Sequence, residues 1–135
     1  VPPSVVLGMG CRKNKELSAV EKAAFSCLKE NDIYPEAVAA LASIDVKKEE
    51  PGLLALSEKL EVPFKTFSSE ELLSMPGEFT PSSFVSKTVG VDNVCERSAV
   101  KAAENYTGIH FIQRKRGAEG VTTALVLGDW RIRFE

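Results

Sequence analysis

The segment Val38–Ile44 most constrains the fold, because nearly every residue in it is apolar. A strand with two apolar faces must be covered on both sides, as the central strands of α/β sheets are. A shorter apolar run, Val5–Leu7, precedes it. Between the two runs, apolar residues recur at helical spacing, which predicts an amphipathic helix over 17–31 with the stripe Val20, Ala24, Cys27 and Leu28. This order predicts parallel strands joined by a helix.

The rest of the chain extends this pattern. Pro51 suits the first position of a second helix that runs to Leu60, and 62–67 predicts a short edge strand. Ser68 to Glu71 is a capping box that starts a further helix. The apolar runs 109–114 and 121–127 flank a glycine-containing loop, 115–120, which favours an antiparallel pair. We therefore predict one three-layer α/β/α domain over residues 1–135, with a mixed, mainly parallel sheet of about five strands.

Four other segments are predicted less simply. Residues 75–81 contain two prolines and one glycine and predict a loop that could serve as a lid. A short helix is expected over 82–88. Asp92 and Asn93 are expected to cap the next helix, whose buried stripe would be Cys95, Ala99, Ala102 and Tyr106. Residues 130–134 alternate apolar or aromatic with basic, which fits either an edge strand or a tail.

Gly8 and Gly10 follow the first apolar run and predict a turn into the first helix. Ligands of α/β sheets bind beyond the carboxyl ends of parallel strands, and glycines there let backbone N–H groups approach an anion. This pair lacks the third glycine of a dinucleotide fingerprint, and no P-loop lysine follows. Two interpretations stay open: the floor of a ligand site, or a tight turn without a ligand.

Composition excludes several classes of protein. The net charge of −2 argues against general nucleic-acid binding, and no apolar run is long enough to span a membrane. Cys11, Cys27 and Cys95 are odd in number and widely spaced, which favours reduced thiols in the cytosol over disulfides or a bound metal. The start, Val1-Pro2-Pro3, resembles a cropped or processed end rather than a signal peptide. His110, the only histidine, falls within a predicted strand and fits a structural role.

Several polar residues are candidates for a site. Asp45, Lys47 and Glu50 follow the second strand, at the edge of the sheet where the glycine turn is expected. Basic residues gather in two clusters that can attract an anion, Arg12, Lys13 and Lys15, and Arg114, Lys115 and Arg116. The alternative is that these are solvated charges, with Glu50 favoured only by the dipole of its helix. Cys11, beside Arg12, is either a reactive thiolate or a packing residue.

Five segments together resemble one family, the C-terminal domain of the cobalamin-biosynthesis protein CbiG, found also as the stand-alone protein CobE. They occur in the family's order and spacing: Gly8–Arg12, Ile44–Leu53, Val89–Glu96, Ile112–Arg116 and Val121–Ala124. The resemblance covers Val5 to Leu127. It implies an α/β domain of a hydrolase that opens the δ-lactone of cobalt-precorrin-5A and releases acetaldehyde. It also implies an anionic corrinoid substrate that carries the cobalt, no cofactor held by the protein, and an N-terminal CbiG domain or other pathway enzymes as partners.

The resemblance leads to two hypotheses about chemistry. In the first, Glu96 or Asp45 is the general base, and the N–H groups of Gly10 and Cys11 stabilise the oxyanion. Because the helix dipole gives a first-turn carboxylate only about 0.3–1 kcal/mol, Glu96 should matter more for function than for stability. In the second, the domain binds a corrinoid intermediate without catalysing a reaction. Phosphate or nucleotide binding at Gly8 and Gly10 is a weaker third alternative.

Overall fold

The computed structural model describes residues 4–11, 17–45, 49–74, 94–104, 108–118 and 120–129. These residues form a five-stranded sheet with the order β3-β2-β1-β5-β4. Its strands are β1 (Val5–Cys11), β2 (Val38–Ile44), β3 (Phe64–Phe67), β4 (Gly108–Ala118) and β5 (Val121–Asp129). The β1–β2 and β2–β3 ladders are parallel, whereas β1–β5 and β4–β5 are antiparallel. The predicted mixed sheet is confirmed, with four of its strands pointing the same way.

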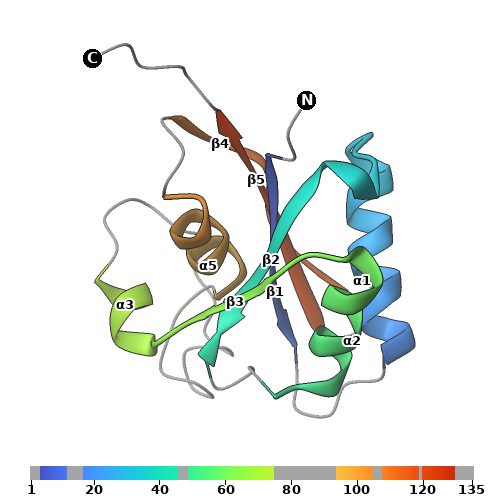
Figure 1. Cartoon of the computed structure of the whole chain (residues 1–135), viewed down its shortest axis with the longest axis horizontal. Coiled ribbons are helices and arrows are strands. Elements are labelled where there is room, and N and C mark those ends of the chain that lie inside the picture. Colours follow the sequence, from blue (N-terminus) through green and yellow to red (C-terminus); the bar gives the residue numbers. More distant parts are fainter. Residues whose placement is uncertain are drawn as a thin grey trace.

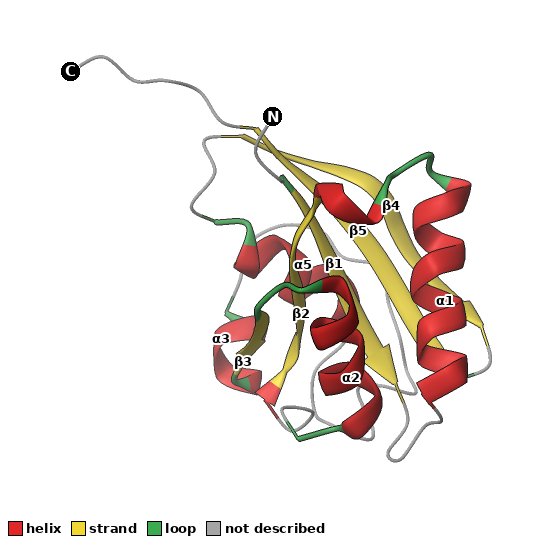
Figure 2. Ribbon diagram, turned by 45° about the vertical axis from the view of Figure 1, so that its right-hand side comes forward, coloured by secondary structure: helices red, strands yellow, loops and turns green. Residues whose placement is uncertain are grey.

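Helices cover both faces of the sheet, which confirms the three-layer arrangement (Figures 1 and 2). Helices α1 (Leu17–Glu30) and α2 (Pro51–Leu60) lie on one face, and α3 (Ser69–Leu73) and α5 (Val94–Ala102) lie on the other. A short 3-10 helix, η1 (Pro35–Ala37), leads into β2. Pro51 occupies the start of α2, and the capping box joining Ser68 and Glu71 is present at α3. Both were predicted from the sequence.

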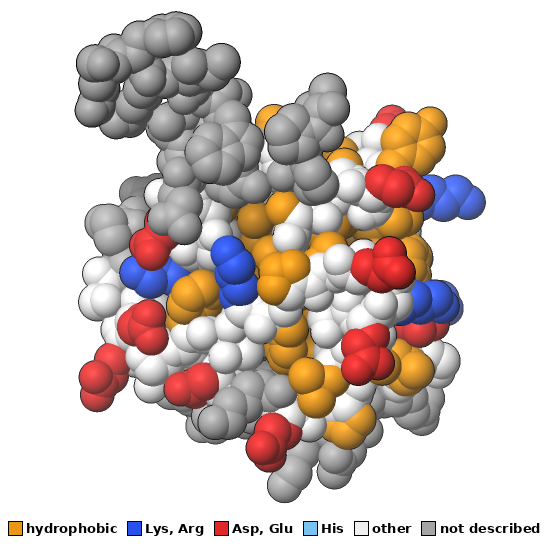
Figure 3. All heavy atoms as spheres, in the orientation of Figure 1, with side chains coloured by type: hydrophobic (Ala, Val, Ile, Leu, Met, Phe, Trp, Pro, Cys, Tyr) orange, Lys and Arg blue, Asp and Glu red, His pale blue; other side chains and the backbone are white. Residues whose placement is uncertain are grey.

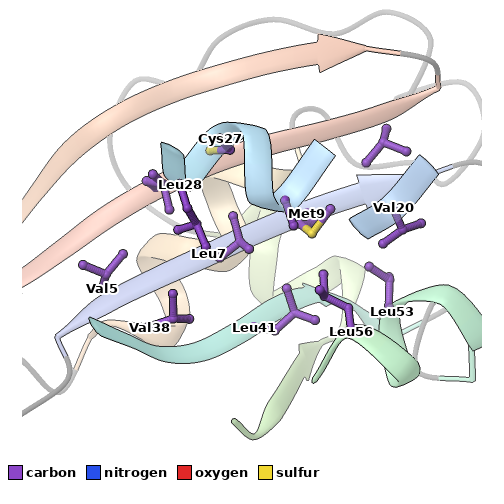
Figure 4. Packing of buried hydrophobic residues seen from close by; sticks show 13 residues of the cluster. Val5, Leu7, Met9, Val20, Cys27, Leu28, Val38, Leu41, Leu53 and Leu56 are labelled. Atoms are coloured by element: carbon purple, nitrogen blue, oxygen red, sulfur yellow. The ribbon is translucent and has the colours of Figure 1, made fainter. Parts of the chain in front are cut away.

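The core has two halves because successive side chains of a strand point to opposite faces. Val5, Leu7 and Met9 of β1 point toward α1 and α2, where they join the largest buried cluster (Figure 4). The α1 members of this cluster are the predicted stripe Val20, Ala24, Cys27 and Leu28. Val6, between them, packs instead with small residues of α5 and of the turn that follows it, and with β5: Ala99, Ala102, Ala103 and Val126.

The glycine pair does not form the predicted turn. Strand β1 continues to Cys11, and Gly8 and Gly10 pair with Ala124 and Thr122 of β5. Gly8 serves close packing: a Cβ built on it would lie 1.9 Å from the carbonyl oxygen of Cys95. Local sequence favoured a turn, but pairing with β5 and the contact with α5 keep these glycines in the strand.

The hairpin of β4 and β5 is also longer than predicted. Residues 115–118, expected in its loop, belong to β4, and the ladder is irregular near Gln113. Gly120 has a φ of 79° and provides the left-handed residue that the tight connection needs. The expected loop 75–81, the helix 82–88, Asp92, Asn93, Tyr106 and the segment 130–134 lie outside the described residues.

We predict that Gly8→Ala destabilises the protein by about 3 kcal/mol, because the new methyl group must displace the backbone of α5. Gly117→Ala is the matched control, since the nearest atom to its Cβ would be 3.7 Å away, an ordinary contact. Urea denaturation of the two variants measures the difference. Equal midpoints for Gly8→Ala and the wild type would show that α5 does not depend on this close approach.

Candidate functional site

The candidate site lies at the edge of the sheet formed by the carboxyl end of β1. From β1 the chain proceeds to β2 on one side, and later returns to place β5 on the other side. In open α/β sheets, ligands bind beyond the carboxyl ends of parallel strands, and the parallel β1 and β2 both end at this edge, whereas the antiparallel β5 begins there. Helix α1 leaves this edge on one face, and the first turn of α5 reaches it on the other, beside Gly8 and Gly10.

Strands β1 and β2 separate at this edge. Their parallel register runs as far as the pair Gly8–Ala42, whereas β1 pairs with β5 as far as Cys11–Val121. Residues 9–11 therefore extend beyond the last paired position of β2. Such a separation leaves backbone groups on the β2 side of β1 beyond its last paired position. Because successive N–H groups of a strand point to opposite sides, only one of Gly10 and Cys11 directs its N–H to this side, so the two expected oxyanion donors do not point the same way.

Glu96 is the most completely buried charged residue described, with no exposed surface. One carboxylate oxygen, Oε2, accepts a hydrogen bond of 2.6 Å from the backbone N–H of Lys115 in β4. The other, Oε1, lies 3.5 Å from a guanidinium nitrogen of Arg114. A single side chain of α5 thus connects the start of that helix to β4, the edge strand two positions from β1.

Arg114, one of the three basic residues at 114–116, is the second partner of Glu96. Its guanidinium lies over the ring of Phe111, 4.2 Å from the ring centre, and its side chain is 53% exposed. A charged group that stacks on an aromatic ring and pairs with a buried carboxylate is held in one orientation. Sequence reasoning placed Arg114 in a basic cluster but did not connect it to Glu96, since 17 residues and a helix separate them.

The partners of Glu96 revise the expectation about its stability. That expectation considered only the helix dipole, whereas the structure adds a buried charge-assisted hydrogen bond and an ion pair. Removing Glu96 would leave the N–H of Lys115 without its acceptor, which costs about 1–3 kcal/mol, whereas the half-exposed Arg114 would stay solvated. Glu96 therefore contributes substantially to the fold, and its role as a general base stays a prediction.

The other predicted acidic residues lie at the end of β2. Asp45 directly follows the strand and is partly exposed. Glu50 is the N-cap residue of α2 and is only 7% exposed, yet its side chain makes no capping hydrogen bond. Its Oε1 atom and the hydroxyl of Ser43 are buried without a hydrogen-bond partner. Ser43 was missed, although it is the one polar residue in the apolar run 38–44.

The basic candidates are only partly placed. Lys115 lies near the carboxyl end of β4, at the same edge of the sheet as the carboxyl end of β1, and its N–H donates a hydrogen bond to Glu96. Arg116, next to it, pairs instead with Glu30 of α1 on the opposite face. Arg12 and Lys47 lie outside the described residues, so their expected contacts with a ligand stay predictions.

The three cysteines form no disulfide bond with one another, as their spacing predicted. Burial raises the pKa of Cys95 to about 12 and also raises the pKa of Cys27. Both therefore stay protonated near neutral pH and are poor nucleophiles. Cys11 is partly buried at the end of β1 and packs against the larger core cluster. This contact agrees with the packing interpretation of Cys11.

Neither histidine nor metal chemistry is indicated by the described residues at this edge. His110 is exposed and lies in β4 opposite Leu127 of β5, which in turn lies opposite Val5 of β1. Because Val5 is the first residue of β1, His110 lies far along the sheet from the carboxyl edge. In the described ranges, no three His, Cys, Asp or Glu side chains lie close enough together to hold a metal ion.

No described helix has the length and apolar character needed to cross a membrane.

Comparison with known proteins gives a consistent result. The family described as the cobalamin synthesis G C-terminus matches residues 5–126. The chain is 40% identical over 94 residues to the cobalt-precorrin-5A hydrolase of Salmonella typhimurium, an alignment that covers 70% of this chain and 27% of that protein. The chain thus spans about a quarter of the length of this relative.

The protein CobE is similar over nearly its whole length. The chain is 28% identical to CobE of a Sinorhizobium species over 132 residues, covering 97% of this chain and 84% of the relative. A crystal structure of CobE, described as a protein of the cobalamin (vitamin B12) biosynthetic pathway, superposes with a TM-score of 0.84 at 28% identity. That superposition covers 94% of this chain and 92% of the CobE chain.

We predict that Glu96→Ala lowers the free energy of unfolding by about 1–3 kcal/mol, because it leaves the Lys115 N–H without its acceptor. Glu104→Ala is the control: this carboxylate forms only an exposed ion pair with Lys101 and should cost less than about 1 kcal/mol. Chemical denaturation gives both values. Equal stability of the two variants would contradict the anchoring role of Glu96.

Proposed function

Since the chain belongs to the family of the cobalamin synthesis G C-terminus, we propose that it acts in cobalamin biosynthesis as the C-terminal domain of a cobalt-precorrin-5A hydrolase. In this reaction water opens the δ-lactone of the substrate, and the two-carbon unit leaves as acetaldehyde. The similarity to the Salmonella hydrolase supports the assignment.

The observation that carries this proposal is the composition of one sheet edge. Carboxylates suited to acid–base chemistry, Asp45, Glu50 and Glu96, lie there with the end of β1. Lactone hydrolysis needs a group that accepts a proton from water and donors that stabilise the oxyanion. In the proposed site a carboxylate accepts the proton, and one backbone N–H at the end of β1, that of Gly10 or Cys11, faces the oxyanion.

The proposed substrate is a macrocycle fringed with carboxylates, which basic side chains recognise by charge-assisted hydrogen bonds. We assign this recognition to Arg12, Lys47 and Lys115, with Gly8 close to the site. On the face shown in Figure 3, acidic and basic side chains are intermixed, so among the coloured residues charge of one sign is not concentrated. We propose that attraction of the anion is local to the sheet edge, and the net charge of −2 argues against nucleic acid as a partner.

The setting follows from this assignment. Cobalt arrives within the substrate, so the protein itself needs no cofactor for hydrolysis. Free thiols and the biosynthetic family support a cytoplasmic location. The proposed partner is the N-terminal region that a longer hydrolase carries, or another enzyme of the pathway.

A second candidate function is that of a corrinoid-binding module without catalysis. The similarity to CobE favours it, since the two chains match over most of their lengths. Such a module would hold an unstable intermediate at the same edge. The two functions differ in whether the bound lactone is opened.

Turnover distinguishes the two functions. The chain should be assayed alone and also as a replacement for the matching C-terminal region of the Salmonella hydrolase, with the truncated hydrolase as control. Acetaldehyde release from cobalt-precorrin-5A by either form, above the truncated control, is the expected result. Binding without release would favour the corrinoid-binding module. Neither binding nor release would reject both functions.

We also predict that replacing both Arg12 and Lys115 by Ala weakens corrinoid binding about 100-fold, because two charged hydrogen bonds of about 1.5 kcal/mol each are lost. Folding should be retained, since the bond to Glu96 uses the backbone N–H of Lys115. Affinity of the wild type should fall with added salt.

The control variant replaces Lys29 and Lys59 by Ala. Both lysines lie in the last turn of a helix, Lys29 in α1 and Lys59 in α2, whereas the proposed site lies where these helices begin. Absorbance titration of each double variant with the corrinoid at two salt concentrations gives the affinities. If both double variants bind equally well, Arg12 and Lys115 do not recognise the substrate.

A further inference from the structure

Glu50 carries an unusual feature for a buried residue. Only 7% of the residue is exposed, and its Oε1 atom is fully covered and has no hydrogen-bond partner. Buried polar atoms in native proteins are almost always paired, so an unpaired carboxylate oxygen requires an explanation. A carboxylate that acts on a substrate or a water molecule keeps an oxygen available in this way.

Helix α2 does not explain the position of this carboxylate. Glu50 is the N-cap residue, and its backbone oxygen accepts the first helical hydrogen bond, from the N–H of Leu54. Its side chain caps no N–H group, and Pro51, next in the helix, has no N–H to offer. The charge is favoured by the start of the helix, but the oxygen is left without a donor.

A second unpaired polar atom lies nearby in the fold. Ser43 has no exposed surface, and its hydroxyl lacks a partner. Leu41, two residues earlier in β2, packs with Leu53 and Leu56 of α2. Because side chains alternate along a strand, Ser43 faces the same layer. Both unpaired atoms therefore belong to the carboxyl end of β2 on the α2 side, next to the point where β1 and β2 separate.

The other carboxylates of the site have no buried oxygen without a hydrogen-bond partner. Both oxygens of Glu96 are engaged, one by the Lys115 N–H and the other by Arg114. Asp45 is partly exposed, so water satisfies it. A general base must direct a free lone pair at the proton that it removes. Among the described carboxylates at this edge, Glu50 meets that requirement best.

We infer that Glu50, rather than Glu96, is the general base of lactone opening, an assignment that rests on the proposed hydrolase function. Glu50 Oε1 accepts a proton from water while the water oxygen forms a bond to the lactone carbonyl carbon. The π electrons move onto the carbonyl oxygen and then return, breaking the bond between the acyl carbon and the ring oxygen. The proton passes from Glu50 to that departing oxygen, so one water is consumed and Glu50 is again ionised.

The test is Glu50→Gln, which keeps the size of the side chain and removes its ability to accept the proton. In whichever form turns over cobalt-precorrin-5A, kcat should fall about 100- to 10,000-fold, while substrate affinity and melting temperature change little. Glu49→Gln is the matched control, because this exposed neighbour should retain wild-type kcat. Glu96→Gln should melt at a lower temperature, because it weakens the contacts of Glu96 with Lys115 and Arg114.

Wild-type kcat in folded Glu50→Gln overturns the assignment, as does a large loss of kcat in folded Glu96→Gln alone. If Glu50→Gln does not fold, Glu50→Asp decides, because the carboxylate is retained but displaced. Folded Glu50→Asp should lose about 100-fold in kcat, and an unchanged kcat overturns the assignment. A wild type without turnover rejects the hydrolase function and this assignment with it, whereas an active wild type isolates the failure to Glu50.

Discussion

The structure depends on how closely the backbone of α5 approaches β1. The carbonyl oxygen of Cys95 occupies the place where a side chain of residue 8 would lie, so only glycine permits the contact. This approach lets the small residues of α5 pack on the sheet and brings the first turn of the helix to the carboxyl edge. The position of Glu96, and hence its bond to β4, follows from the same contact.

Two glutamates at this edge differ in what surrounds them. Glu96 is held by an N–H and a guanidinium on β4, which fixes α5 against the edge strand. Glu50 is also buried, with 7% of its surface exposed, but keeps an oxygen without a partner. A carboxylate with both oxygens bonded stabilises the structure, whereas an unpaired one retains a lone pair for a reacting molecule. One site can therefore contain an anchoring carboxylate and a reactive one.

The sequence by itself determined the architecture. The apolar run 38–44 required cover on both faces, and the stripe of α1, the capping box of Ser68 and the proline of α2 set where helices begin and which sides they bury. These signals are local, because they depend on the 2-residue period of strands, on the 3.6-residue period of helices and on the residues at helix ends. The order of motifs also identified the family, and the positions of Asp45, Glu50 and Glu96 placed carboxylates near one sheet edge.

Only the tertiary structure decided what individual residues do there. Gly8 and Gly10 read as a turn in the sequence, but pairing with β5, more than 100 residues away, extends the strand through them. Lys115 read as a loop residue, but β5 draws it into a strand where its N–H meets Glu96. Whether a buried carboxylate has a partner depends on atoms distant in the chain, so no local pattern separates Glu50 from Glu96.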